Sequence, residues 1–120
     1  HPSYKINMEE IHHIQKLDAP SGTAISLAEG IIENHENYDN WFCPQAETNN
    51  INNNGIAIEA LREPEVPGTH AIHYTSSIDS LTISHQAHNR TGFATGAVVA
   101  AEWLLHKKGI FTMRDVLNIK

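Results

Sequence analysis

The sequence has 120 residues, of which 40% are hydrophobic and 18% are charged, and its formal net charge is −6. This length and composition predict a single globular domain over residues 1–120 and exclude a disordered chain. The negative charge, without a lysine or arginine cluster, argues against a nucleic-acid partner. No apolar run approaches the roughly 18 residues of a membrane span, so no membrane partner is expected. The single cysteine, Cys43, excludes an internal disulfide framework and suits a reducing cytoplasm.

The first predicted element is a strand over residues 4–13. Its alternation places Ile6 and Met8 on one face. If the pleat continues, Glu10 and His12 share that face, because successive side chains of a strand point to opposite sides. The strand therefore carries apolar residues first and ionisable residues later on the same face.

A polar turn at residues 18–23 leads into a predicted helix over about residues 23–35. Ser21 or Thr23 suits the N-cap position, because a hydroxyl oxygen there can accept a hydrogen bond from a free backbone N–H. The apolar stripe of this helix consists of Ile25, Ala28, Ile31 and Ile32.

Residues 36–55 are rich in asparagine and predict a long surface loop, with a short apolar patch at Trp41 and Phe42. Three strands are predicted after it, and the short connection between the last two indicates a hairpin. These strands cover residues 56–62, 69–76 and 80–88.

Two helices are predicted in the last part of the chain, over about residues 91–107 and 113–117. The expected core face of the longer one consists of Phe93, Ala97, Ala101, Leu104 and Leu105. The order β-α-β-β-β-α predicts an α+β fold, with a mixed four-stranded sheet and helices packed on one face.

Nine histidines raise the question of a metal site. The neighbouring pairs at positions 12 and 13, 70 and 73, and 85 and 88 have spacings that send the two rings of a strand to opposite faces. No His-Glu-x-x-His helix is present either, so we expect no metal ion. The glycines form neither Gly-x-Gly-x-x-Gly nor a Walker pattern, so this chain carries no Rossmann domain.

The segment Glu10–Ala24 has the strongest chemical pattern. The helix start at residues 21–23 would present backbone N–H groups, and Gly22 lets a ligand approach the backbone. A carboxylate bound there would gain charge-assisted hydrogen bonds from Lys16 and a histidine, and a histidine can act as a general acid. The alternative is that the turn merely caps a helix and Lys16 is solvated. The spacing alone leaves both open.

The same segment resembles the signature of the dihydrodipicolinate reductase family (4-hydroxy-tetrahydrodipicolinate reductases) of lysine and diaminopimelate biosynthesis. The pattern Glu-x-His-His-x-x-Lys-x-Asp-Ala-Pro-Ser-Gly-Thr-Ala matches at every fixed position from Glu10 to Ala24. Further matches occur at residues 67–70, 85–97 and 109–117, so the resemblance covers about residues 4–118. One departure is Pro64, where the family usually has glycine.

The resemblance implies a role for each matching residue. His12 would donate or accept a proton, and Lys16 would be a second proton donor. His13, Gly22 and Thr23 would bind the carboxylates of a small cyclic dicarboxylate substrate. The roles of His70 and Arg90 stay open.

The resemblance also implies an NAD(P)H-dependent reduction to tetrahydrodipicolinate. NADPH or NADH would be bound mainly by an N-terminal domain that this sequence lacks, and the chain would be the C-terminal substrate-binding domain. Family members form homotetramers whose sheets pack together. That packing would explain the polar face formed by Ser80, Thr82, Ser84, Gln86 and His88.

Two other functions compete with this one. The chain could be a non-catalytic dicarboxylate-binding or assembly module, because it cannot hold a nicotinamide by itself. It could also be the substrate domain of another nicotinamide-dependent reductase, although the complete signature argues against that.

Overall fold

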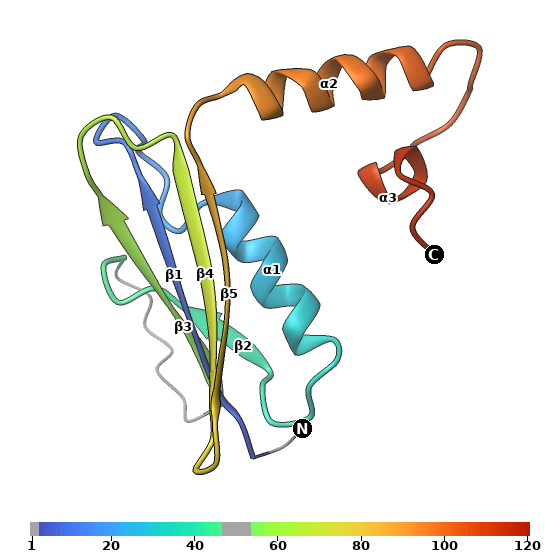
Figure 1. Ribbon diagram of the computed structural model, residues 1–120. Coiled ribbons are helices and arrows are strands. Elements are labelled where there is room, and N and C mark those ends of the chain that lie inside the picture. Colours follow the sequence, from blue (N-terminus) through green and yellow to red (C-terminus); the bar gives the residue numbers. More distant parts are fainter. Residues whose placement is uncertain (1–2, 47–53) are drawn as a thin grey trace. The chain divides into compact units, whose positions relative to one another are not determined.

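A computed structural model describes residues 3–46 and 54–120. The chain divides into two compact units, His1–His88 and Asn89–Lys120, which we describe separately. Among the described residues, the first unit contains five strands and one helix, and the second contains two helices (Figure 1). The single domain expected from the sequence stays a prediction.

The first unit is built on a five-stranded sheet with the order β2-β3-β1-β4-β5. Strand β3 runs parallel to both β1 and β2, whereas β4 runs antiparallel to both β1 and β5. The mixed sheet and the α+β class are therefore confirmed. The strands are β1 (Lys5–His12), β2 (Asn40–Phe42), β3 (Gly55–Arg62), β4 (Gly68–Thr75) and β5 (Ser80–Ala87).

The prediction of four strands was wrong by one edge strand. The short strand β2 lies in the asparagine-rich segment, where Trp41 pairs with Ile56 and Phe42 with Ala57. Three residues are too few to show an alternation in sequence, so the apolar patch was assigned to a loop. Residues 47–53 of that predicted loop lie outside the described residues.

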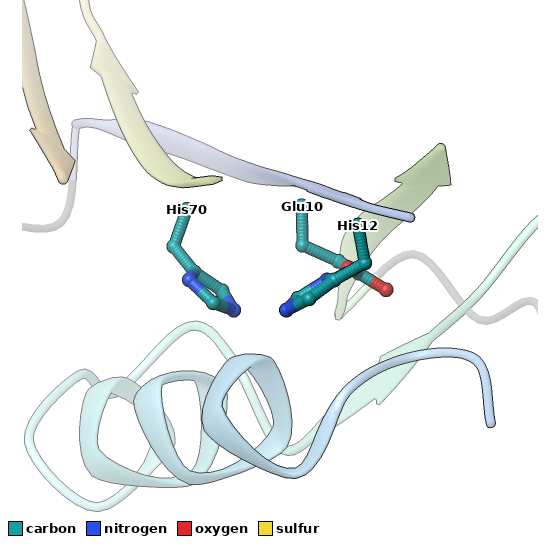
Figure 2. Close-up of side chains that lie close together, drawn as sticks. All are labelled: Glu10, His12 and His70. Atoms are coloured by element: carbon teal, nitrogen blue, oxygen red, sulfur yellow. The ribbon is translucent and has the colours of Figure 1, made fainter. Parts of the chain in front are cut away.

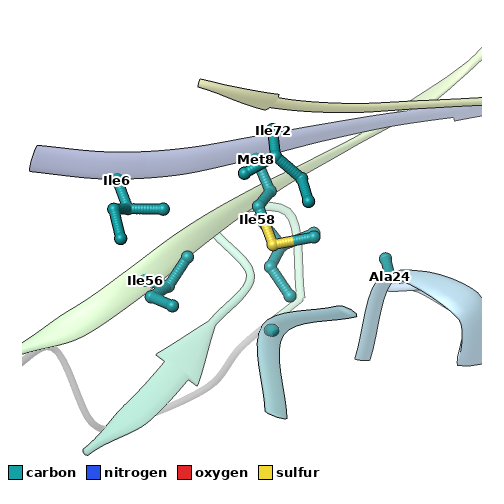
Figure 3. Close-up of a cluster of buried hydrophobic side chains, with 7 residues drawn as sticks. Ile6, Met8, Ala24, Ile56, Ile58 and Ile72 are labelled. Atoms are coloured by element: carbon teal, nitrogen blue, oxygen red, sulfur yellow. The ribbon is translucent and has the colours of Figure 1, made fainter. Parts of the chain in front are cut away.

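Helix α1 (Gly22–Ile32) covers one face of this sheet (Figure 1). Ala24 and Ala28 are fully buried, and their small side chains let the helix approach the strands. Against them pack the apolar side chains of three strands, which Figure 3 shows as one cluster. The cluster consists of Ile6, Met8, Ile56, Ile58 and Ile72. This core fixes the face of β1 on which Glu10 and His12 also lie.

The second unit consists of α2 (Thr91–Trp103) and α3 (Met113–Val116). Helix α2 ends before the predicted residue 107, and none of its residues is buried, so its predicted core face was wrong. Within this unit the ring of Trp103 meets Phe111 edge-on, with centroids 5.1 Å apart, but so short a segment cannot enclose a helix. No helix among residues 3–46 and 54–120 has the length and apolar character needed to cross a membrane.

Candidate active site

The sheet register gathers four polar side chains at one end of β1. Glu10 lies opposite His70 on β4, and His12 lies opposite Arg62 on β3. The alternation of β1 turns Glu10 and His12 toward the buried face, as the sequence predicted. Figure 2 shows Glu10, His12 and His70 projecting from the strands on the same side of the sheet. Three strands therefore contribute to one cluster.

Glu10 is a fully buried carboxylate at the centre of this cluster. Its Oε1 accepts hydrogen bonds from Nη1 and Nη2 of Arg62, both at 3.0 Å, and from the backbone N–H of Ser21 at 3.2 Å. Its Oε2 is paired with Nδ1 of His12. A buried charge is tolerated only when it is paired and hydrogen-bonded, and both oxygens of Glu10 meet that condition.

His12 is also buried, with 9% of its surface exposed. Its Nδ1 is turned to Glu10, and its Nε2 lies toward the start of β4. A Cβ atom on Gly68 would come within 3.1 Å of that Nε2. Glycine at the start of β4 therefore leaves room beside the outer ring nitrogen of His12.

His70 connects the cluster to the start of α1. Its ring meets the ring of His12 edge-on, with centroids 5.1 Å apart, and its Nε2 lies 3.0 Å from Oγ of Ser21. Burial lowers the pKa of His70, and the neighbouring His12 lowers it further. His70 is therefore biased toward the neutral imidazole.

Lys16 lies in the loop between β1 and α1, where its Nζ forms a 3.0 Å ion pair with Asp18. The ammonium of Lys16 holds the pKa of Asp18 below its ordinary value. The same loop is tied to β3, because Nε of Arg62 donates to the Lys16 carbonyl at 3.3 Å and Nη2 donates to the Asp18 carbonyl at 2.6 Å. His13 begins this loop, and its Nδ1 lies 3.1 Å from the Gln15 side chain.

The start of α1 has the geometry expected of an anion site. Ser21 is the N-cap, and its Oγ accepts the Ala24 N–H at 3.2 Å. Gly22 and Thr23, which form the first turn, are exposed, and nothing lies within 4 Å of a Cβ built on Gly22. Backbone at a helix N-terminus can bind a carboxylate, because its first N–H groups have no partner within the helix.

A metal ion is another possible occupant of the cluster. Glu10, His12 and His70 each offer one ligand atom, and these atoms lie within 4.8 Å of one another. The spacing argument from sequence considered neighbouring histidines only, so it did not address a group drawn from two strands. In the structure Arg62 already supplies a cation to Glu10, and a metal ion would have to compete with it. The absence of a metal stays a prediction.

A hollow elsewhere in the first unit does not suit a dicarboxylate. It lies between the end of α1 and β2 and has a volume of about 470 Å³. Its lining includes Glu29, Glu33 and Asp39, which would repel an anion. The polar cluster beside the start of α1 is therefore the better candidate for a dicarboxylate site.

The family model for dihydrodipicolinate reductase, C-terminus, matches residues 1–117 of this chain. The chain belongs to this family. It is 53% identical to the 4-hydroxy-tetrahydrodipicolinate reductase of Christiangramia forsetii, over 96% of this chain and 46% of that protein. It is 39% identical to the 4-hydroxy-tetrahydrodipicolinate reductase of Desulfotalea psychrophila, over 98% of this chain and 45% of that protein.

A solved structure supports the same family and fold. The dipicolinate-bound dihydrodipicolinate reductase of Paenisporosarcina superposes with a TM-score of 0.64 at 27% sequence identity, covering 88% of this chain and 42% of that chain. The chain thus spans less than half the length of each reductase described here.

The described residues of this chain do not form a dinucleotide-binding fold. The sheet is mixed and not the doubly wound parallel sheet of a Rossmann domain. Helix α1 begins at Gly22 directly after Pro20 and Ser21, and no dinucleotide fingerprint lies at its start.

Arg62 is the site residue that the sequence reasoning missed. The signal was a cation at the end of a predicted strand, together with a glutamate on the buried face of another strand. A buried glutamate requires a partner, but the sequence does not show which strand supplies it.

Proposed function

We propose that this chain is the substrate-binding domain of a 4-hydroxy-tetrahydrodipicolinate reductase. In this proposal the loop after β1 and the start of α1 bind a cyclic dicarboxylate. His13, Gly22 and Thr23 contact its carboxylates, and His12 and Lys16 donate protons. The reduction yields tetrahydrodipicolinate.

The observation that carries this proposal is the placement of His12 beside the start of α1. A buried histidine held by a carboxylate is suited to proton transfer, because its ring orientation and tautomer are set in advance. The first turn of α1 and Lys16 supply the positive potential that a dianion needs. The dipicolinate bound to the Paenisporosarcina reductase supports this class of ligand.

In this proposal the hydride comes from NADPH or NADH that is bound mainly outside this chain, since the described residues do not form a Rossmann domain. We also infer a homotetramer and a cytoplasmic location. The strand β5 supports self-association, because it is an edge strand with Leu81 and Ile83 more than half exposed. The single cysteine, Cys43, is buried, and a chain with one cysteine suits the reducing cytoplasm.

Calorimetric titration with pyridine-2,6-dicarboxylate tests the site. We expect Lys16→Ala to weaken binding about tenfold or more, because a hydrogen bond to a charged group contributes about 1.5–3 kcal/mol. Lys5→Ala is the matched control, since Lys5 is an exposed lysine at the far end of β1 and its removal changes the net charge equally. Equal affinities of the native chain and Lys16→Ala would contradict the assignment of Lys16.

A further inference from the structure

We propose that Glu10 is a positioning residue that keeps a proton on Nδ1 of His12, so that Nε2 is the nitrogen presented to the substrate. The first half of the proposal, the proton on Nδ1 of His12, concerns the protein alone and needs no ligand. The second half, the presentation of Nε2 to the substrate, rests on the proposed function, because it assumes that the dicarboxylate binds beside His12.

The two oxygens of Glu10 have different partners, and this difference determines how the carboxylate is oriented toward His12. All the partners of Oε1 are hydrogen-bond donors, namely the Arg62 guanidinium and the Ser21 backbone N–H. They hold the carboxylate in one orientation and leave Oε2 facing Nδ1 of His12. An ionised carboxylate only accepts hydrogen bonds, so the hydrogen between Oε2 and Nδ1 belongs to the histidine.

The other ring nitrogen of His12, Nε2, is the one that can exchange a proton with the substrate. Among residues 3–46 and 54–120, no hydrogen bond to Nε2 of His12 accompanies the one at Nδ1. A Cβ atom added to the neighbouring Gly68 would lie 3.1 Å from Nε2, so the glycine keeps this side of the ring uncrowded. A neutral His12 with its proton on Nδ1 has a lone pair at Nε2, and a protonated His12 donates from Nε2 and returns to the same neutral form.

His70 does not take over this role, because it has a different partner. Ser21 Oγ accepts the Ala24 N–H, so the Ser21 hydroxyl hydrogen is free to donate to Nε2 of His70, 3.0 Å away. His70 then acts as an acceptor in its neutral form, in keeping with its burial. One histidine of the pair is thus assigned to the helix cap and the other to the substrate.

This arrangement makes a specific prediction for Glu10→Gln. Arg62 and Ser21 continue to require an acceptor at the position of Oε1, so the glutamine must place its carbonyl oxygen there. Its NH2 group then occupies the position of Oε2 and donates to Nδ1 of His12. The proton of neutral His12 moves to Nε2, and the tautomer is reversed without loss of the side chain.

Nitrogen-15 NMR of the histidine rings tests the proposal, with His12 assigned by the signals lost in His12→Asn. In the native chain at mildly alkaline pH, we expect a protonated Nδ1 and an unprotonated Nε2. Glu10→Gln should exchange the two patterns, whereas Glu59→Gln, an exposed glutamate on β3, should change neither. A native His12 protonated mainly at Nε2 overturns the proposal, even where Glu10→Gln fails to fold. An unchanged tautomer in folded Glu10→Gln overturns it as well.

The second half is tested by adding pyridine-2,6-dicarboxylate to the native sample. We expect the Nε2 signal of His12 to shift more than the Nδ1 signal, and a larger shift at Nδ1 overturns the assignment of Nε2. Failure of the dicarboxylate to bind in calorimetry instead counts against the proposed function and leaves the tautomer result standing. The two proposals can therefore fail separately.

Discussion

The buried face of β1 has two halves that share one alternation but bury different chemistry. Ile6 and Met8 enter an apolar cluster under α1, where nonpolar burial stabilises the fold. Glu10 and His12 continue the same face and are also buried, but they enter a network of hydrogen bonds and ion pairs. The apolar half can accept other nonpolar side chains of similar size. The polar half requires each partner, because a buried charge that loses its partner is costly.

This difference indicates which half serves function. Replacing a buried ion pair by well-packed apolar residues is often neutral or stabilising, so the polar half is weak evidence for stability. A polar network does fix the orientation of its members, and here it orients the ring of His12. We infer that β1 uses its first half to hold α1 in place and its second half to hold a proton donor.

The largest effect should follow from breaking the polar half at Arg62. Arg62→Met leaves the buried carboxylate of Glu10 without its cation, and removal of one partner of a buried pair costs about 3–5 kcal/mol. It also removes the hydrogen bonds to the carbonyls of Lys16 and Asp18, so the loop that carries Lys16 should loosen. We expect lower stability in urea unfolding and, in the folded protein, weaker binding of pyridine-2,6-dicarboxylate.

Met8→Ala is the matched change in the apolar half. It opens a cavity in the core and should cost about 2–5 kcal/mol. Because Met8 belongs to the apolar cluster and not to the polar network, the folded fraction should keep its affinity for the dicarboxylate. The comparison fails if both variants lose affinity equally. It also fails if Arg62→Met loses stability but keeps its affinity for the dicarboxylate.

A smaller effect should appear in the pH dependence of stability. The pKa of His70 is lowered in the folded chain, first by burial and second by His12. The folded chain therefore binds fewer protons at His70 than the unfolded chain does. This contribution is complete above the unfolded value of about 6.5 and is lost as the pH falls through the folded pKa.

Urea unfolding at about pH 7.5 and pH 5.5 measures this effect on either side of the unfolded value. The native chain should lose more stability on acidification than His70→Gln. The exposed His88 provides the control, and His88→Gln should behave like the native chain. An identical loss in the native chain and His70→Gln would show that the burial of His70 is not maintained in solution.

Local features of the site could be predicted from the sequence because they depend on short-range geometry. The period of two in β1 placed Glu10 and His12 on the face of Ile6 and Met8, and the structure confirms this. Ser21 was one of two N-cap residues favoured by capping chemistry, and it is the N-cap in the structure.

Features that depend on strand pairing could not be predicted. The opposition of Arg62 to His12 and of His70 to Glu10 follows from the register between strands, which no local pattern specifies. The strand β2 was missed because it owes its existence to pairing with β3. The core face predicted for α2 failed because periodicity shows which residues share a face but not what covers that face.

Backbone amide shift mapping by NMR, with pyridine-2,6-dicarboxylate titrated into the native chain, tests the central claim most directly. The claim is that the loop after β1 and the start of α1 form the dicarboxylate site. We expect the largest shifts at Lys16, Gly22 and Thr23, with His12 also affected. Shifts centred on the hollow at Glu29 and Trp41, or none at the start of α1 when binding is seen, would contradict the account.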